Sequence, residues 1–294
     1  MSTLVAEPAL VAASKRSRGA QLRRFARRNP TIVAGGIILG LVALLAILAP
    51  LFAGDAVTMR PAMRLRPPSA QDWLGTDHLG RDVFARMIYG AQVSLIVGLA
   101  VAAVSIVVGT FIELMAGYFR KVDAVVMRLM DGLMSIPAIL LAIALVALTR
   151  TSVSTVIIAI TIPEVPRVVR LVRAVVLGVR EAPYVEAAIS GGTPTWKILL
   201  RHILPSTIAP LIVQATYICA SAILIEAALS FLGAGTPPEI PTWGNMIAQS
   251  RLFLSRAPWT IFAPGIALAL VVLAVNLLGD GLRDRLDPRL ARRM

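Results

Sequence analysis

Acidic side chains inside apolar stretches are the residues of this sequence whose types and positions could do chemistry. Glu164 lies between two prolines, and Glu226 lies in the apolar run 208–232. A charge at the centre of a bilayer costs at least ~2.5 kcal/mol on insertion scales, so an acid kept there is a functional hypothesis by default. Such an acid could relay protons, contact a passing solute or hold neighbouring helices together. For Glu164 the last alternative is an ion pair with Arg167 or Arg170, one or two helical turns further on.

Metal and nucleotide chemistry have little support in the sequence. His78 with the nearby Asp77 and Asp82 could suggest a metal site, but one histidine with scattered carboxylates is weak evidence for ligands. The only other histidine is His202, and the single cysteine, Cys219, allows no intrachain disulfide. The chain also contains no GxxxxGK[ST] loop, which would cradle nucleotide phosphates. We therefore expect no catalytic residue, no metal site and no cofactor bound directly by this chain.

Composition indicates an integral membrane protein. The chain has 294 residues, of which 57% are hydrophobic and 15% charged, with a mean hydropathy of +0.79. Soluble domains have roughly 45–50% apolar and about 25% charged residues. The net charge of +13 could suggest nucleic acid as a partner. However, the arginines flank apolar runs without interleaved aromatic residues, which is typical of cytoplasmic membrane flanks, so we expect no nucleic acid.

Apolar segments predict six transmembrane helices. The first has 23 residues without a charge, and at ~1.5 Å per residue it reaches ~35 Å, enough for a hydrocarbon core of ~30 Å. It is also longer than the ~7–15 apolar residues of a cleavable signal peptide. We expect Pro137 to kink the third helix, and Pro163 and Pro166 to break the fourth and leave it partly hydrated. The expected spans are 31–53, 93–119, 125–148, a fourth beginning with 152–162, 208–232 and 260–278.

The distribution of positive charge predicts the orientation. Six spans put both termini on one side, and that side carries 21 of the 29 lysines and arginines. Because cytoplasmic flanks are rich in these residues, we expect cytoplasmic termini. The chain then divides into a cytoplasmic tail (1–30), the first helix (31–53), an extracytoplasmic segment (54–92), a five-helix core (93–280) and a cytoplasmic tail (281–294).

A polar turn and a short helix interrupt the core at about 181–205. Gly191 and Gly192 can end the preceding helix because glycine adopts left-handed backbone angles. Thr193 suits the N-cap of the next helix, and Pro194 suits its first position. Apolar residues then recur at helical spacing and are expected to share one face: Trp196, Leu199, Leu200, Ile203 and Leu204. This amphipathic helix could contact a partner protein or lipid headgroups.

The loop resembles the EAA loop of bacterial ABC importer permeases, a cytoplasmic helix-turn-helix that docks on an ATPase subunit. The resemblance rests on Glu186-Ala187-Ala188, on Gly192 and on the ILP sequence at 203–205. Other strings are similar to permeases for peptides and nickel: WLGTDHLGRDVF (73–84), MRLMD (127–131), EAALSFLG (226–233) and NLLGDGLRD (276–284). The chain thus resembles the second, C-type permease of a dipeptide, oligopeptide or nickel importer.

The resemblance implies an all-α membrane protein with the type I ABC importer permease fold, in the bacterial inner membrane. The implied partners are a homologous second permease, two cytoplasmic ATPases that bind ATP and Mg²⁺, and an extracytoplasmic solute-binding protein. ATPase docking would involve Glu186, Ala187, Ala188, Gly192, Trp196, Leu199, Leu200 and Ile203. The translocation path would involve Pro137, Glu164, Gln214, Tyr217 and Glu226. Because Glu226 lies in a string that matches the family, a structural hydrogen bond is favoured for it over substrate choice.

Di- or oligopeptides are the implied cargo, and nickel, glutathione and opine-like solutes are alternatives, since the binding protein usually sets selectivity. A proton-coupled secondary transporter is an alternative from another class. It would use Glu164 or Glu226 as a proton relay and would need no ATPase. An intramembrane enzyme has little support, because both histidines lie outside the expected spans.

Overall fold

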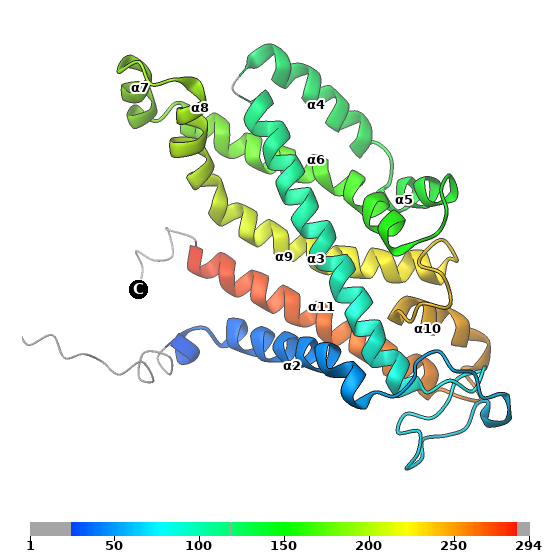
Figure 1. The fold of residues 1–294 in the computed structure, drawn as a ribbon. Coiled ribbons are helices and arrows are strands. Elements are labelled where there is room, and N and C mark those ends of the chain that lie inside the picture. Colours follow the sequence, from blue (N-terminus) through cyan, green and yellow to red (C-terminus); the bar gives the residue numbers. More distant parts are fainter. Residues whose placement is uncertain (1–24, 118, 287–294) are drawn as a thin grey trace, which may run out of the picture.

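The computed structural model describes residues 25–117 and 119–286, and this part of the chain is built from helices (Figure 1). Its one β feature is an isolated bridge between Thr76 and Asp82. A π-helical turn, Leu199–Ile203, joins α8 to α9. The helices are α2 (Pro30–Phe52), α3 (Val83–Ala116), α4 (Arg120–Met134), α5 (Ala138–Ala147), α6 (Val153–Arg180), α7 (Pro183–Ser190), α8 (Thr195–Ile198), α9 (Leu204–Phe231), α10 (Trp243–Ser250) and α11 (Trp259–Leu286).

Four helices are long and apolar enough to cross a membrane: α2, α3, α11 and the continuous helix Thr195–Phe231 that contains α9. A fifth span results if α4 and α5, which meet at a bend of 85°, are counted together. The helix α6 is not among them, because charged residues from Glu164 onward interrupt its apolar sequence. The described chain is therefore all-helical with four or five candidate spans.

Two bends differ from the sequence-based expectation. Pro137 was expected to kink one continuous helix, but it stands at the N-cap of α5, and the chain is fully broken between α4 and α5. Conversely, the expected break at Pro163 and Pro166 is wrong, since α6 continues through both prolines. Just beyond these prolines α6 packs closely on α3: a Cβ on Gly109 of α3 would lie 2.6 Å from Cβ of Val168.

The helix α3 begins ten residues before the expected second span. Asp82 caps it by accepting a hydrogen bond of 2.8 Å from the backbone N–H of Phe84. Upstream, the charges expected to pair locally do so, since Asp77 lies 2.7 Å from Nε of Arg81 and 3.8 Å from Nε of Arg86. Arg81 also donates to Oε1 of Gln249 at 2.6 Å, which ties the segment before α3 to α10.

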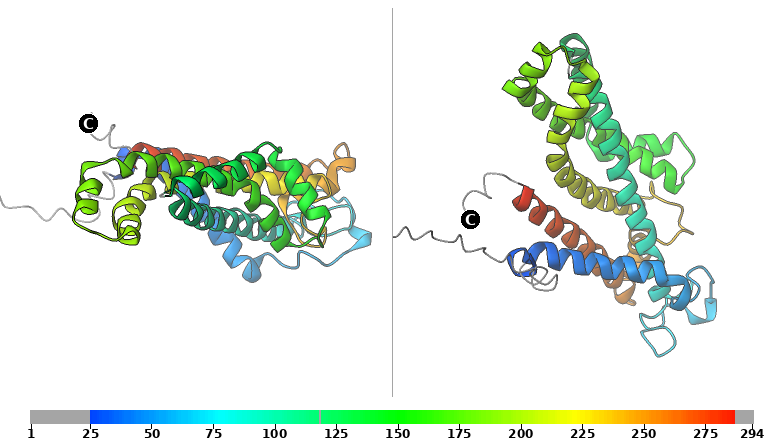
Figure 2. Two further views of the ribbon diagram at one scale, coloured as in Figure 1. Left: turned by 90° about the horizontal axis from the view of Figure 1, so that it is seen from above. Right: turned by 60° about the vertical axis from the view of Figure 1, so that its left-hand side comes forward.

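The long helices run between two ends of the molecule. The start of α2, the end of α11 and the α7–α8 hairpin lie at one end, and α10 with the segment between α2 and α3 lies at the other (Figure 1). The helices α2 and α11 pack side by side and diverge from α4 and α6 toward the hairpin end (Figure 2). Residues 1–24 of the N-terminal tail, Tyr118 and the tail from Asp287 onward lie outside the described residues.

Candidate functional site

The α7–α8 hairpin has the glycine turn that the sequence predicts. Gly191 caps α7, and its N–H donates to the carbonyl oxygen of Ala187 at 2.9 Å. Gly192 has a φ of +75°, in the left-handed region that favours glycine. The next helix begins one residue later than expected, at Thr195, with Pro194 in place of Thr193 at the N-cap.

The apolar residues of the second helix do not share one face, so that expectation is wrong. Leu199 and Ile203 are buried, whereas Trp196 and Leu200 are 59% and 53% exposed. Trp196 and Leu200, four residues apart, face outward, whereas Leu199 and Ile203, also four residues apart, face the core. Leu199 and Ile203, predicted to dock on an ATPase, are buried in the hydrophobic core together with Ile198.

Seven of the exposed residues of the hairpin form what we call the coupling surface: Tyr184, Glu186, Ala187, Ile189, Gly192, Trp196 and Leu200. Ala188 is partly buried at its edge. Tyr184 and Ile189 are about half exposed and were not predicted as part of this site. The sequence signal that could have found these two residues is their apolar character within an otherwise polar turn. Such a cluster of exposed apolar side chains on a hairpin is typical of a protein contact.

Three arginines of α6 are each paired with an acid. Nη1 of Arg167 lies 2.6 Å from Oε1 of Glu164, which is fully buried. The other two pairs join α6 to α4 across the sequence: Arg170–Asp131, Arg173–Asp123. Of the alternatives for Glu164, the ion pair with Arg167 is the one observed. The two pairs with α4 were missed, because their partners lie 39 and 50 residues apart.

Glu226 is fully buried near the end of α9 that faces α10. Its Oε1 accepts a hydrogen bond of 2.8 Å from the hydroxyl of Ser230, and that hydroxyl accepts one from the N–H of Thr236 at 3.4 Å. Thr236 is in turn bound by the side-chain amide of Asn245 on α10. These contacts hold the loop after α9 against α10, which is the structural arrangement favoured for Glu226.

Glu113 is a further buried acid, near the end of α3. Within the described residues neither of its carboxylate oxygens has a hydrogen-bond partner. It is the only acid of a 34-residue helix, and that isolation is the sequence signal that could have found it.

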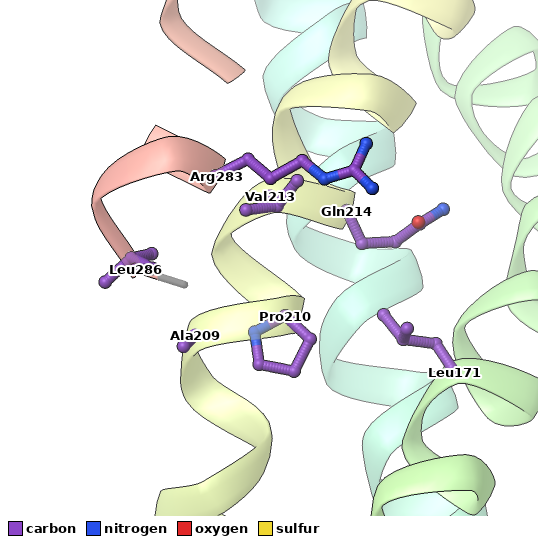
Figure 3. Close-up of a pocket in the computed structure, with 7 residues that line it drawn as sticks. All are labelled: Leu171, Ala209, Pro210, Val213, Gln214, Arg283 and Leu286. Carbon is purple, nitrogen blue, oxygen red and sulfur yellow. The ribbon is translucent and has the colours of Figure 1, made fainter. Parts of the chain in front are cut away.

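The residues predicted for a translocation path do not converge on one site within this chain. Glu164 and Glu226 are buried in separate contacts, while Pro137 and Tyr217 are exposed on different helices. Gln214 lines a cleft of about 480 Å³ between α6, α9 and α11 (Figure 3). Groups of three or more potential metal ligands do not occur among the described residues.

Residues 105–292, well over half of the sequence, match the family described as "Binding-protein-dependent transport system inner membrane component". The chain belongs to this family of permeases. It is a multi-pass inner membrane protein, and such a permease works with a partner permease, ATPases and a binding protein. Residues 17–68 of the permease also match the "N-terminal TM domain of oligopeptide transport permease C".

Curated relatives extend over nearly the whole permease. A probable peptide ABC transporter permease of Sinorhizobium fredii is 60% identical over 92% of the permease and 93% of the relative. A dipeptide transport system permease of Alkalihalophilus pseudofirmus is 44% identical over 90% and 88%. A glutathione transport system permease of Pectobacterium atrosepticum is 40% identical over 91% and 90%. The permease thus resembles relatives named for peptides and for glutathione.

Proposed function

We propose that this permease is the C-type membrane subunit of an ATP-driven peptide importer and forms half of its translocation path. The observation that carries the proposal is the coupling surface, an exposed apolar hairpin at the end of the molecule where α2 starts and α11 ends. The relatives named for peptide and dipeptide transport support a peptide cargo. Nickel, glutathione or opine-like solutes would use the same machinery.

The coupling surface docks on a cytoplasmic ATPase in this proposal. The hairpin is joined directly to α6 on one side and, through the continuous helix Thr195–Phe231, to α9 on the other. A displacement of the hairpin is therefore transmitted to two long helices at once, which is a rigid-body route for alternating access. The two ATPases carry the ATP and Mg²⁺, and the permease itself binds no cofactor and catalyses no reaction.

The proposed topology has six spans with both termini in the cytoplasm. The sixth span is α6, whose Glu164 is neutralised by Arg167 and buried against the rest of the bundle. Charged residues inside membrane segments face the protein interior in this way. The described end of α11 also lies close to the start of α2, since the guanidinium carbon of Arg285 is 4.6 Å from the ring centre of Phe25.

The translocation path is proposed to lie between this permease and its homologous partner. Pro137, Glu164 and Tyr217 remain its candidate residues, Gln214 lies in the cleft between α6, α9 and α11, and Glu226 is assigned to the structural contact described above. Arg167 pairs with Glu164 and Arg170 with Asp131, and the side chains of both arginines are partly exposed.

Affinity purification of the complete transporter from its native cells tests the docking proposal. The test variant is Trp196→Glu with Leu200→Glu, and the control is Leu252→Glu, an apolar and even more exposed position at the opposite end of the molecule. We expect the control to retain two ATPases and a second permease and the test variant to lose the ATPases. Retention of the ATPases by the test variant would contradict the proposal. Wild-type protein that purifies alone would favour a secondary transporter.

Uptake by whole cells tests the cargo. Cells that express the transporter should accumulate a labelled dipeptide in excess of cells that lack the permease. Uptake of glutathione or Ni²⁺ but not of any di- or oligopeptide would sink the peptide assignment while leaving the ATP-driven mechanism intact.

A further inference from the structure

The cleft between α6, α9 and α11 combines apolar walls with two polar groups. Leu171, Pro210, Val213 and Leu286 form the walls, and Arg283 extends from the last turn of α11 toward Gln214 on α9 (Figure 3). Its volume of about 480 Å³ is in the range of ligand sites, which are mostly apolar with a few placed polar groups. No function assigned so far uses Arg283.

Arg283 is available to bind a ligand. Among the described residues it forms no ion pair or hydrogen bond, and the described residues that line the cleft include no acid. A guanidinium has five N–H donors in a fixed planar fork that matches the geometry of a phosphate oxyanion. The amide of Gln214 adds two donors and one acceptor nearby. The cleft therefore fits an anion that carries an apolar part.

The position of the cleft favours a membrane lipid as the anionic ligand. The helix α11 has 28 residues, so at ~1.5 Å per residue it is ~42 Å long and exceeds a hydrocarbon core of ~30 Å. Arg283 and Leu286 lie in its last turn, which in the proposed topology extends past the hydrocarbon core to the headgroups of the cytoplasmic leaflet. Basic pockets between transmembrane helices on the cytoplasmic side bind anionic headgroups.

We propose that this cleft is a binding site for an anionic phospholipid of the cytoplasmic leaflet. Arg283 binds the phosphate, Gln214 hydrogen-bonds the polar headgroup, and Leu171, Pro210 and Val213 contact the first methylenes of an acyl chain. A peptide cargo fits less well, because its ammonium group would need an acid that the described lining does not provide. The same reasoning favours a headgroup without a positive charge, such as phosphatidylglycerol, over phosphatidylcholine. The proposal rests on the proposed membrane topology.

Native mass spectrometry of the purified transporter tests the site. The delipidated complex is mixed with equal amounts of phosphatidylglycerol and phosphatidylcholine, and the lipid that stays bound to this permease is measured. The matched control is Arg285→Gln, which removes the same charge from the same helical turn but from a side chain that stacks on Phe25 outside the cleft. We expect wild type and Arg285→Gln to retain phosphatidylglycerol and Arg283→Gln to retain about tenfold less, the scale of one lost charge-assisted hydrogen bond.

A second variant, Val213→Trp, fills the cleft and leaves Arg283 in place. It should also lose phosphatidylglycerol, while its thermal unfolding without lipid stays near that of wild type. Equal retention by Arg283→Gln and Arg285→Gln would overturn the proposal. So would displacement of the lipid by a dipeptide in wild type, because the cleft would then be a cargo site. Co-purified ATPases are counted in the same spectra, so failure of the docking proposal is seen separately from failure of lipid binding.

Discussion

Arg173 on α6 holds Asp123 on α4 through two hydrogen bonds, 2.6 Å from Nε and 2.8 Å from Nη2. The pair is partly buried and has the bidentate geometry in which arginine binds carboxylates most strongly. It joins the bent α4–α5 unit to the helix that leads into the coupling hairpin. A strong ion pair at this position makes α4 move together with α6.

A double-mutant cycle of Asp123→Asn and Arg173→Gln should give a coupling energy of about 1 kcal/mol. The control cycle uses Asp131 and Arg170, whose side chains are 57% and 45% exposed, and should give under about 0.5 kcal/mol because solvent screens the pair. Unfolding in a denaturing detergent can be followed by the reactivity of the buried Cys219, the only thiol of the chain. A reversed order of the two coupling energies would show that burial does not set them.

Replacing Arg167 should lower the free energy of unfolding more than replacing its partner Glu164. Arg167→Gln leaves a fully buried carboxylate without its counter-ion, which we expect to lower the free energy of unfolding by about 3 kcal/mol. Glu164→Gln leaves only a part-exposed guanidinium, which can reach water, and should cost about 1 kcal/mol. The double variant should recover most of the stability that Arg167→Gln loses. The same thiol assay measures all three, and equal losses for the single variants would contradict the buried charge.

Gly192 and Gly191 should respond differently to alanine. Gly192 has a φ of +75°, so Gly192→Ala should cost about 1–2 kcal/mol even though its Cβ would meet no atom within 4 Å. Gly191 has an ordinary φ of −75°, and Gly191→Ala should cost less. Hydrogen exchange of the hairpin amides measures the local effect. Faster exchange in Gly191→Ala than in Gly192→Ala would argue against the observed turn.

Stability should fall in mild acid because of His78, which lies before α3 and outside the spans. Burial lowers the pKa of His78, and Asp77 offsets this only in part. Its ring stacks on Phe253, and its buried Nδ1 has no partner among the described residues. The unfolded chain therefore takes up a proton near pH 6.5, where the folded chain does not. The free energy of unfolding should be highest above about pH 6.5. It should fall as the pH drops further, until His78 is protonated in the folded state as well.

Unfolding midpoints between pH 8 and pH 5 check this prediction. His78→Gln should flatten the curve, and the control His202→Gln, which removes the chain's only other histidine, should keep the slope. An unchanged slope in His78→Gln would assign the pH dependence to other groups.

The glycine turn of the hairpin was accessible from sequence because its signal is local. It follows from the backbone freedom of glycine, and the EAA string predicts that the hairpin is the coupling element. Which residues the hairpin exposes was not accessible, since it depends on which side of the helix packs against the core. Leu199 is buried there, and Leu200 is exposed.

The sequence by itself determined the membrane class, most of the apolar helices and the family, because hydropathy and short motifs are read along neighbouring residues. Only the tertiary structure decided the 85° bend between α4 and α5, the unbroken course of α6 and the pairing of its arginines with α4. The same is true of the cleft where Arg283 approaches Gln214. These features depend on side chains that are distant in sequence, and their contacts form only when the helices pack.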